Sequence, residues 1–240
     1  MELSVIVPVF NGANYIKENL SFLEKELGSI CSDFEIIVVS DGSKDGTEKK
    51  INEIKSRYIK SYHYSKNQGK GFALKYGALK AKGKLIAFLD ADMELSPKEL
   101  FKFLKLMELY DCDIVIGSKR HPQSKVNYPF FRKLQSFLYQ SLVFLLFRLN
   151  IKDTQTGIKL FKREILDLIL PKTLVKKYAF DLELLVIASH FGFKKILEAP
   201  IELNYKFAST VTFSSAWKTF IDTLAVYYRL KIKKYYDKTF

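Results

Sequence analysis

The stretch from Lys84 to Glu99, KLIAFLDADMELSPKE, decides the fold. Lys84–Leu89 is a short apolar run typical of a buried strand, and it ends in the acidic turn Asp90–Asp92. Ser96 then supplies an N-cap residue, with proline at the first helical position and glutamate at the third. A helix is therefore predicted from there to about Tyr110, and the whole stretch reads as one βα unit.

The same alternation of strands and helices continues on both sides of this unit. The other β-rich runs of the first half are Leu3–Pro8, Glu35–Ser40, Ser61–Tyr64 and Ile114–Gly117, and the helical patterns between them are Asn14–Leu27, Gly46–Ser56 and Gly71–Ala81. This order predicts an α/β fold with a Rossmann-like, mainly parallel sheet flanked by helices.

The pattern changes after Gly117. Lys119–Lys133 is basic and loop-like, and Leu134–Leu149 has the composition of an apolar helix. The remaining elements predicted are helices over Ile165–Leu170, Tyr178–Phe191 and Ser215–Tyr236, and strands over Lys195–Glu198 and Ile201–Tyr205. Since no repeat and no Pro- or Ser-rich linker interrupts the chain, we expect one domain over residues 1–212, followed by a basic aromatic C-terminal helix over 213–240.

Composition narrows the class of protein. A chain of 240 residues with 48% hydrophobic residues is able to bury its own core, which excludes a disordered, collagen-like or disulfide-stapled protein. The net charge of +13 favours anionic partners. Cys31 and Cys112 show no pairing or zinc pattern, and no secretory leader is visible, so we expect a cytosolic protein. The longest uncharged stretch, Leu134–Phe147, is too short to span a bilayer.

Carboxylates gather where the strand Lys84–Leu89 ends. Asp90, Asp92 and Glu94 alternate along the chain, so three side chains are able to converge on one hard divalent cation, Mg²⁺ or Mn²⁺, beside nucleotide phosphates. The alternative is a solvated acidic loop that caps a helix.

Two further loops lie at predicted strand ends. Asp41-Gly42-Ser43 is either a ligand-binding turn or an ordinary turn and helix cap. Lys66–Gly71 is a basic, glycine-punctuated loop that opens a helix and suits an anion. It lacks the spacing of an ATPase P-loop, and no G-x-G-x-x-G follows the first strand, which argues against a dinucleotide-dependent dehydrogenase.

Four segments in order, VIVPVFNGANYI (5–16), IIVVSDGSKDGT (36–47), residues 66–97 and IVIGSK (114–119), resemble the family 2 inverting glycosyltransferases of the glycosyltransferase-A fold. Within that family, TQTGIKLFKRE (154–164), YAFDLELL (178–185) and EAPIELNYKFASTVTF (198–213) are similar to the polyprenol-phosphate glycosyltransferases, which glycosylate dolichyl or undecaprenyl phosphate. The resemblance covers nearly the whole chain.

The resemblance implies a donor site at the first strand ends. Pro8, Phe10 and Asp41 would frame the base and ribose of a nucleotide sugar, and Lys70 would lie near the donor together with Asp90. The metal, Mg²⁺ or Mn²⁺, would be held on the diphosphate by Asp90, Asp92 and Glu94.

The resemblance also implies an acceptor site. The residues expected to bind an acceptor phosphate are Lys119 or Arg120, Arg132, and Lys206, which stands where the family has arginine. The residues expected to take part in catalysis are Asp92, Lys119, Arg120, Arg132 and Asp181.

The chemistry of the acceptor decides the mechanism. A lipid phosphate is already anionic and needs no general base, whereas a sugar hydroxyl would need one, for which Asp153 and Asp181 are the candidates. A glycan-extending family 2 enzyme is therefore the alternative function. A nucleic-acid-binding module ranks far lower, since no nucleic-acid motif is present and carboxylates lie at the strand ends; we expect no nucleic acid as partner.

Two apolar segments point to a membrane surface. Ser215–Tyr236 interleaves aromatic residues with Lys and Arg, the composition of a helix at a lipid interface, and Leu134–Leu149 adds a second apolar helix. Core-packed helices are the alternative for both. We therefore expect a peripheral protein on the cytosolic face of a membrane, with a small membrane-anchoring protein as a further partner.

Overall fold

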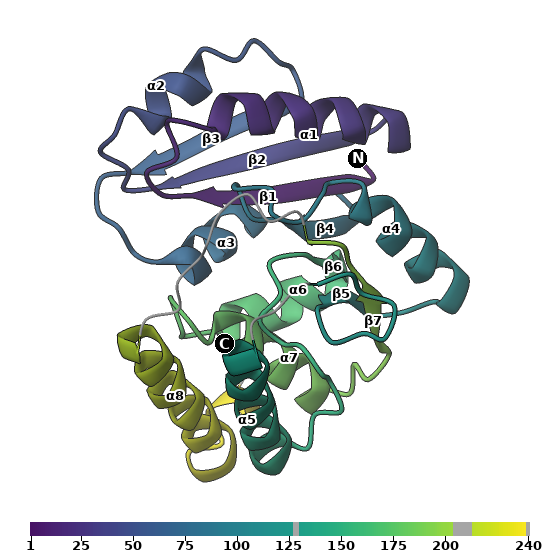
Figure 1. The fold of residues 1–240 in the computed structure, drawn as a ribbon, viewed down its shortest axis with the longest axis vertical. Coiled ribbons are helices and arrows are strands. Elements are labelled where there is room, and N and C mark those ends of the chain that lie inside the picture. Colours follow the sequence, from purple (N-terminus) through teal and green to yellow (C-terminus); the bar gives the residue numbers. More distant parts are fainter. Residues whose placement is uncertain (127–129, 204–212, 239–240) are drawn as a thin grey trace.

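The computed structural model describes residues 1–126, 130–203 and 213–238. At its centre is a seven-stranded sheet in the order β3-β2-β1-β4-β6-β5-β7 (Figure 1). The strands are β1 Leu3–Val9, β2 Phe34–Asp41, β3 Ile59–Tyr64, β4 Leu85–Phe88, β5 Ile114–Ser118, β6 Lys159–Lys162 and β7 Ile196–Pro200. β6 runs antiparallel to both of its neighbours, while the other adjacent pairs are parallel, which confirms the mainly parallel sheet.

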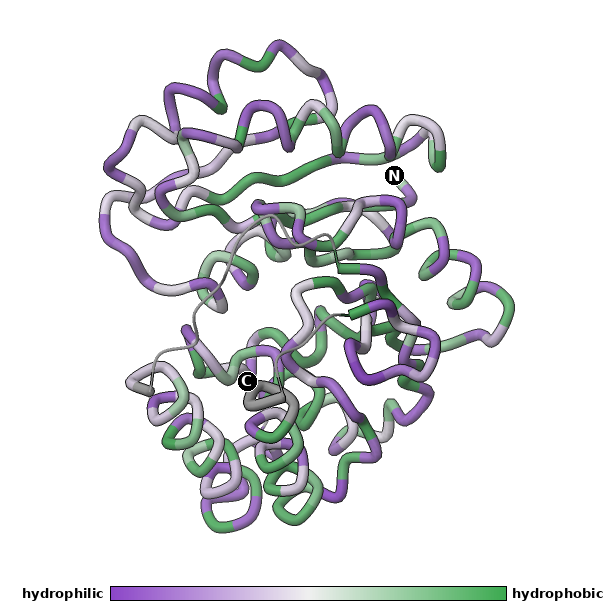
Figure 2. Tube along the Cα trace, in the orientation of Figure 1, coloured by the Kyte–Doolittle hydropathy of each residue, from purple (hydrophilic) through white to green (hydrophobic). Residues whose placement is uncertain are grey.

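Helices cover both faces of this sheet. They are α1 Ile16–Ile30, α2 Thr47–Asn52, α3 Lys70–Ala78, α4 Glu99–Tyr110, α5 Phe130–Phe147, α6 Arg163–Ile169, α7 Phe180–His190 and α8 Phe213–Tyr227. One apolar cluster joins the sheet to α1, α2 and α4, and a second joins it to α3, α6 and α7. β1 and β2 are buried along their whole length, and most of their residues are hydrophobic (Figure 2), as in strands covered on both faces.

Strand β6 was not predicted. It has only four residues and begins and ends with lysine, so its apolar signal is weak. It nevertheless fills the centre of the sheet between β4 and β5, and the side chain of its first residue, Lys159, is fully buried. The interruption of the parallel order at this strand brings residues 154–158, which precede it, to the same edge of the sheet as the ends of β1 and β4.

Two predictions for the C-terminal part differ from the structure. The strand expected over Ile201–Tyr205 is reduced, within its described residues, to isolated bridges at Glu202 and Leu203. The single helix expected over Ser215–Tyr236 is wrong, because α8 ends at Tyr227. A π-helical turn, η2 Tyr228–Ile232, and a short 3-10 turn, η3 Tyr235–Asp237, follow it. They direct the chain back, so that Tyr236 is fully buried in the same cluster as α7.

Helices α5 and α8 lie side by side at the end of the molecule away from β3 (Figure 1). The hydroxyl oxygens of Tyr139 and Thr223 are 3.1 Å apart, and the rings of Phe147 and Tyr227 meet edge to face. In the part of the chain that the structure describes, neither these helices nor any others are long and apolar enough to cross a membrane.

Candidate active site

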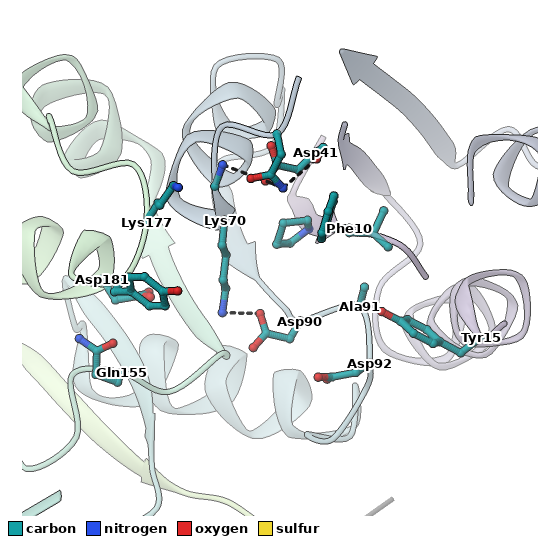
Figure 3. Close-up of a pocket in the computed structure, with 15 residues that line it drawn as sticks. Phe10, Tyr15, Asp41, Lys70, Asp90, Ala91, Asp92, Gln155, Lys177 and Asp181 are labelled. Carbon is teal, nitrogen blue, oxygen red and sulfur yellow. Dashed lines mark hydrogen bonds and ion pairs between the residues drawn. The ribbon is translucent and has the colours of Figure 1, made fainter. Parts of the chain in front are cut away.

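A cleft of about 540 Å³ opens at the carboxyl ends of β1, β2 and β4, where the strand order reverses around β1 (Figure 3). Ligands of open α/β sheets bind at such a position, and the volume suits a small-molecule ligand. The lining residues are Pro8, Val9, Phe10, Tyr15, Asp41, Asn67, Gly69, Lys70, Asp90, Ala91, Asp92, Gln155, Lys177, Tyr178 and Asp181. The structure therefore brings together every residue that the sequence assigned to nucleotide binding.

Asp41 organises the loop that forms one wall of the cleft. Its carboxylate accepts hydrogen bonds from the backbone N–H groups of Gln68 and Gly69, at 2.7 and 2.9 Å, and from the side-chain amide of Asn67 at 3.0 Å. Gly69 has φ of +104°, and a Cβ there would lie 2.6 Å from the carbonyl oxygen of Lys176. Asp41 thus lines the cleft and also holds the glycine-rich loop at the start of α3.

The acidic turn faces that loop from the other wall. Lys70 Nζ lies 2.5 Å from a carboxylate oxygen of Asp90, and Asp92 points into the same space (Figure 3). Desolvation lowers the pKa of Lys70, but the charges of Asp90 and Asp181 outweigh this effect and leave the pKa raised. Burial and the neighbouring Asp90 raise the pKa of Asp92, against the opposing backbone N–H of Glu94.

Only part of the predicted metal site converges in the structure. Asp90 and Asp92 line the cleft, whereas Glu94 is not among the lining residues and its backbone N–H donates to Asp92 Oδ1 at 3.1 Å. No group of three carboxylate, histidine or cysteine side chains is arranged as metal ligands within residues 1–126, 130–203 and 213–238. The two cleft carboxylates still fit a divalent cation, because such an ion would offset the repulsion and burial that raise the pKa of Asp92.

Gly157, in the segment of residues 154–158, lies directly against the acidic turn, and no local pattern in the sequence predicts this contact. A Cβ at Gly157 would lie 2.0 Å from Oδ2 of Asp90, so only glycine leaves the Asp90 carboxylate in its place. Gln155 of the same segment lines the cleft. The signal in the sequence was the segment TQTGIKLFKRE, which carried the family resemblance without assigning a role to these two residues.

Asp181 and Asp153, the two candidate bases, have different surroundings. Asp181, at the start of α7, lines the cleft and accepts a hydrogen bond at 2.7 Å from Nζ of the buried Lys159. That ammonium group also donates to the carbonyl oxygen of Thr156. Asp153 accepts the backbone N–H groups of Lys119 and Gln155, at 3.0 and 3.2 Å, and does not line the cleft. Its observed role is to join two loops.

Lys119 and Arg120, two of the residues predicted to bind the acceptor, are not among the residues that line the cleft. Lys119 and Arg120 follow directly on β5, and the guanidinium of Arg120 lies 5.7 Å from the centre of the Phe137 ring on α5. Nη1 of Arg120 is buried without a hydrogen-bond partner among the described atoms, a costly state for a charged donor that an anion would relieve. The backbone of Arg132 belongs to α5, but its side chain lies outside the described part of the structure, as does the whole of Lys206.

Besides Gln155, the cleft lining includes Tyr15, Lys177 and Tyr178, which the sequence does not predict as site residues. Tyr15 precedes α1, and burial together with the charge of Asp92 raises its pKa. Lys177 and Tyr178 precede α7 in a segment that packs against the glycine-rich loop, since the backbone N–H of Phe72 donates to the carbonyl oxygen of Lys176 at 3.1 Å.

This architecture is that of a glycosyltransferase-A fold, and residues 4–170 match the family described as Glycosyl transferase family 2. The chain therefore belongs to that family and is a nucleotide-sugar-dependent glycosyltransferase. It is 34% identical over 253 residues to a dolichyl-phosphate beta-glucosyltransferase of Trichomonas vaginalis, an alignment that covers 99% of this chain and 77% of the relative.

Solved structures share the fold at low sequence identity. The mannosyl-3-phosphoglycerate synthase from Rubrobacter xylanophilus superimposes with a TM-score of 0.76 at 17% identity, over 97% of this chain and 75% of that one. A second similar structure is the glucosyl-3-phosphoglycerate synthase from Mycobacterium tuberculosis, crystallised with Mn²⁺, uridine-diphosphate-glucose and phosphoglyceric acid. It superimposes with a TM-score of 0.69 at 16% identity, and the alignment covers 94% of this chain and 79% of that one.

Proposed function

We propose that this enzyme transfers a hexose from a nucleotide-diphosphate sugar to a polyprenyl phosphate, with inversion at the anomeric carbon. The observation that carries the proposal is the near full-length similarity to a dolichyl-phosphate beta-glucosyltransferase. The cleft supports it, because it combines a flat aromatic and apolar end at Pro8 and Phe10 with cations and carboxylates suited to a diphosphate. Glucose is the hexose that the relative's name suggests.

The donor half of the reaction uses the residues of the two cleft walls. Pro8, Phe10 and Asp41 frame the base and ribose of the nucleotide. Lys70 and Lys177 bring positive charge to the side of the cleft where the diphosphate leaves. Asp90 and Asp92, together with Glu94, would hold Mg²⁺ or Mn²⁺, which when bound would neutralise charge on the departing nucleoside diphosphate.

The acceptor half requires no proton transfer. A polyprenyl phosphate is anionic at neutral pH, so its oxygen attacks directly and the protein only has to hold and orient it. Lys119, Arg120, Arg132 and Lys206 are proposed to bind this phosphate. Nη1 of Arg120, which is buried and has no hydrogen-bond partner in the described part of the chain, supports the assignment.

The second candidate function is that of a glycan-extending enzyme with a hydroxyl acceptor, and one observation favours it. Asp181 faces the cleft, so a carboxylate is available to take a proton from a hydroxyl. Asp153 is the weaker base candidate, because its carboxylate is occupied by two backbone N–H groups.

The decisive assay crosses donors with acceptors. The purified chain is incubated with Mn²⁺ and a panel of nucleotide sugars, each with polyprenyl phosphate, with the free polyprenol, or with a short glycan. Product on the lipid phosphate alone supports the proposal. Product on the glycan, or equal use of polyprenol and its phosphate, contradicts it and moves the hydroxyl mechanism into first place.

We further propose that the paired helices α5 and α8 rest on the cytosolic surface of a membrane. Large apolar side chains recur along the exposed side of each helix at helical spacing, an unusual surface for a monomer. They are Leu134, Phe137, Leu138, Phe144 and Leu145 on α5, and Trp217, Ile221 and Leu224 on α8. The exposed Lys218, Lys231, Lys233 and Lys234 lie on or just after α8, and each cation near an anionic bilayer contributes about 1 kcal/mol.

Flotation with anionic liposomes tests this surface. Leu145→Ser, at a residue that is 77% exposed, should reduce binding, whereas the control Leu109→Ser, at a residue on α4 that is 73% exposed, should not. Binding of the parent should also weaken as salt rises. A chain that does not float at low salt, or that floats only when a small membrane-anchoring protein is added, contradicts direct attachment.

A further inference from the structure

Glu183 on α7 is a fully buried carboxylate that does not line the cleft. Oε2 accepts the backbone N–H groups of Leu174 and Val175, at 2.9 and 2.7 Å. Oε1 accepts the hydroxyl of Tyr236 at 2.6 Å and lies 3.3 Å from Nη2 of Arg229. Burial raises the pKa of Glu183, against the opposing hydrogen bonds of Tyr236 and Val175. A buried charge with this many donors is a fixed junction between the segments that supply them.

One of these segments leads directly into the cleft. Residues 174–178 connect the two N–H groups held by Glu183 to Lys177 and Tyr178, which line the cleft. The same segment is pressed against the start of α3. A Cβ at Gly69 or Gly71 would lie 2.6 or 2.9 Å from the carbonyl oxygen of Lys176, so little space separates them. A shift of residues 174–178 would therefore be transmitted to the loop that Asp41 holds.

The other segment comes from the C-terminal end. Arg229 lies in η2, directly after α8, and its Nε donates to the hydroxyl of Tyr236 at 3.2 Å. Two more contacts fix this end: Lys172 Nζ donates to the carbonyl oxygen of Lys238 at 2.6 Å, and His190 pairs with Asp237 at 2.5 Å. Residues 228–238 are thus docked on α7 and joined to Glu183 at the same time.

We propose that Glu183 is a positioning residue that couples the C-terminal segment, residues 228–238, to the cleft wall formed by residues 174–178, and thereby sets the placement of Lys177 and Tyr178 against the nucleotide sugar. This inference rests on the proposed function, because it takes the cleft as the donor site. The coupling links the helix proposed to contact the membrane with the site that binds the donor.

Tyr236→Phe is the variant that tests the coupling, since it removes one hydroxyl and leaves the ring in the core. Tyr110→Phe makes the same change at an exposed position on α4 and serves as the control. In the ligand-free protein, Tyr236→Phe should speed hydrogen exchange of the backbone N–H groups of residues 174–178 by about tenfold, because the remaining bonds of Glu183 loosen.

The same variant should raise the KM for UDP-glucose, measured with Mn²⁺, by about fivefold, while the KM for polyprenyl phosphate changes by less than twofold. If Tyr236 had a purely structural role, its replacement would not change the KM for one substrate and leave the KM for the other unchanged. Arg229→Lys, which keeps the charge but loses the planar fork, should give a smaller shift in the same direction. In the double variant Glu183→Gln/Tyr236→Phe, the donor KM should equal that of Glu183→Gln alone, because Tyr236 acts through Glu183.

The outcomes separate this inference from the function on which it rests. If the parent binds UDP-glucose and Tyr236→Phe and Arg229→Lys bind it equally well, the positioning role of Glu183 is overturned and the function stands. Faster exchange of residues 174–178 without any change in donor KM also overturns it. If the parent binds no nucleotide sugar at all, the proposed function fails and this inference falls with it.

Discussion

Replacement of Gly157 by alanine should separate catalysis from stability. The added Cβ would lie 2.0 Å from Oδ2 and 2.6 Å from Cγ of Asp90, whereas real Cβ atoms stay at least 3.0 Å from such neighbours. The Asp90 carboxylate therefore has to swing away by about 1 Å or more. This movement breaks its 2.5 Å contact with Lys70 and removes it from the position proposed for the metal.

The size of the effect follows from that displacement. A misplacement of about 1 Å in a catalytic site costs about 100-fold in rate, equivalent to about 2.7 kcal/mol of transition-state stabilisation. The cost in stability should be small, because the displaced group is the end of a side chain. A compatible glycine-to-alanine change also reduces the freedom of the unfolded chain, which contributes about 0.4–1 kcal/mol in the opposite direction.

The assay compares kcat/KM for glycosyl transfer with the urea midpoint of unfolding. Gly157→Ala should lose about 100-fold in kcat/KM and change the unfolding free energy by no more than about 1 kcal/mol. Gly28→Ala on α1 is the matched control, because a Cβ there meets nothing within 4 Å. An active Gly157→Ala protein would refute the reasoning, since Asp90 would then not need its observed position.

Three further predictions address the metal, the buried ion pair and the acceptor. Asp92→Asn, like excess EDTA on the parent, should abolish turnover while the thermal unfolding midpoint stays near that of the parent; full activity in EDTA contradicts the metal assignment. Asp181→Asn should cost about 3–5 kcal/mol in urea unfolding, because it leaves the buried Lys159 ammonium unpaired, whereas Asp167→Asn in an exposed pair should cost about 1 kcal/mol or less. Arg120→Ala should raise the KM for polyprenyl phosphate by about tenfold or more and leave the donor dissociation constant within a few-fold, and an unchanged acceptor KM would remove Arg120 from the site.

Local signals account for the parts of the fold that the sequence predicted well. The buried residues of α1 are Ile16, Leu20, Leu23 and Leu27, whose helical spacing is visible in the sequence. Strand β6 has no such signal, because two of its four residues are lysines. The buried ammonium group of Lys159 is satisfied by the nearby Thr156 carbonyl oxygen and by Asp181, which is distant in sequence, and no local pattern encodes the pairing with Asp181.

The candidate site also contains both residues that local sequence signals predict and residues that they do not. Asp41, Asp90 and Asp92 line one cleft, because the carboxyl ends of parallel strands meet at one edge of a sheet. Lys177 reaches the cleft through close packing of its segment on Gly69 and Gly71, which depends on the folded chain and not on spacing. Contacts of this kind become visible only when the structure is known.

The central claim is that the sugar is transferred to a phosphate oxygen with inversion. The most direct measurement is NMR analysis of the lipid product made from an α-linked nucleotide sugar and polyprenyl phosphate, through the phosphorus coupling and the configuration of the anomeric carbon. We predict a β-linked hexosyl phosphodiester. An α-linked product, or a glycosidic bond to a hydroxyl oxygen with no phosphorus coupling, would contradict the account.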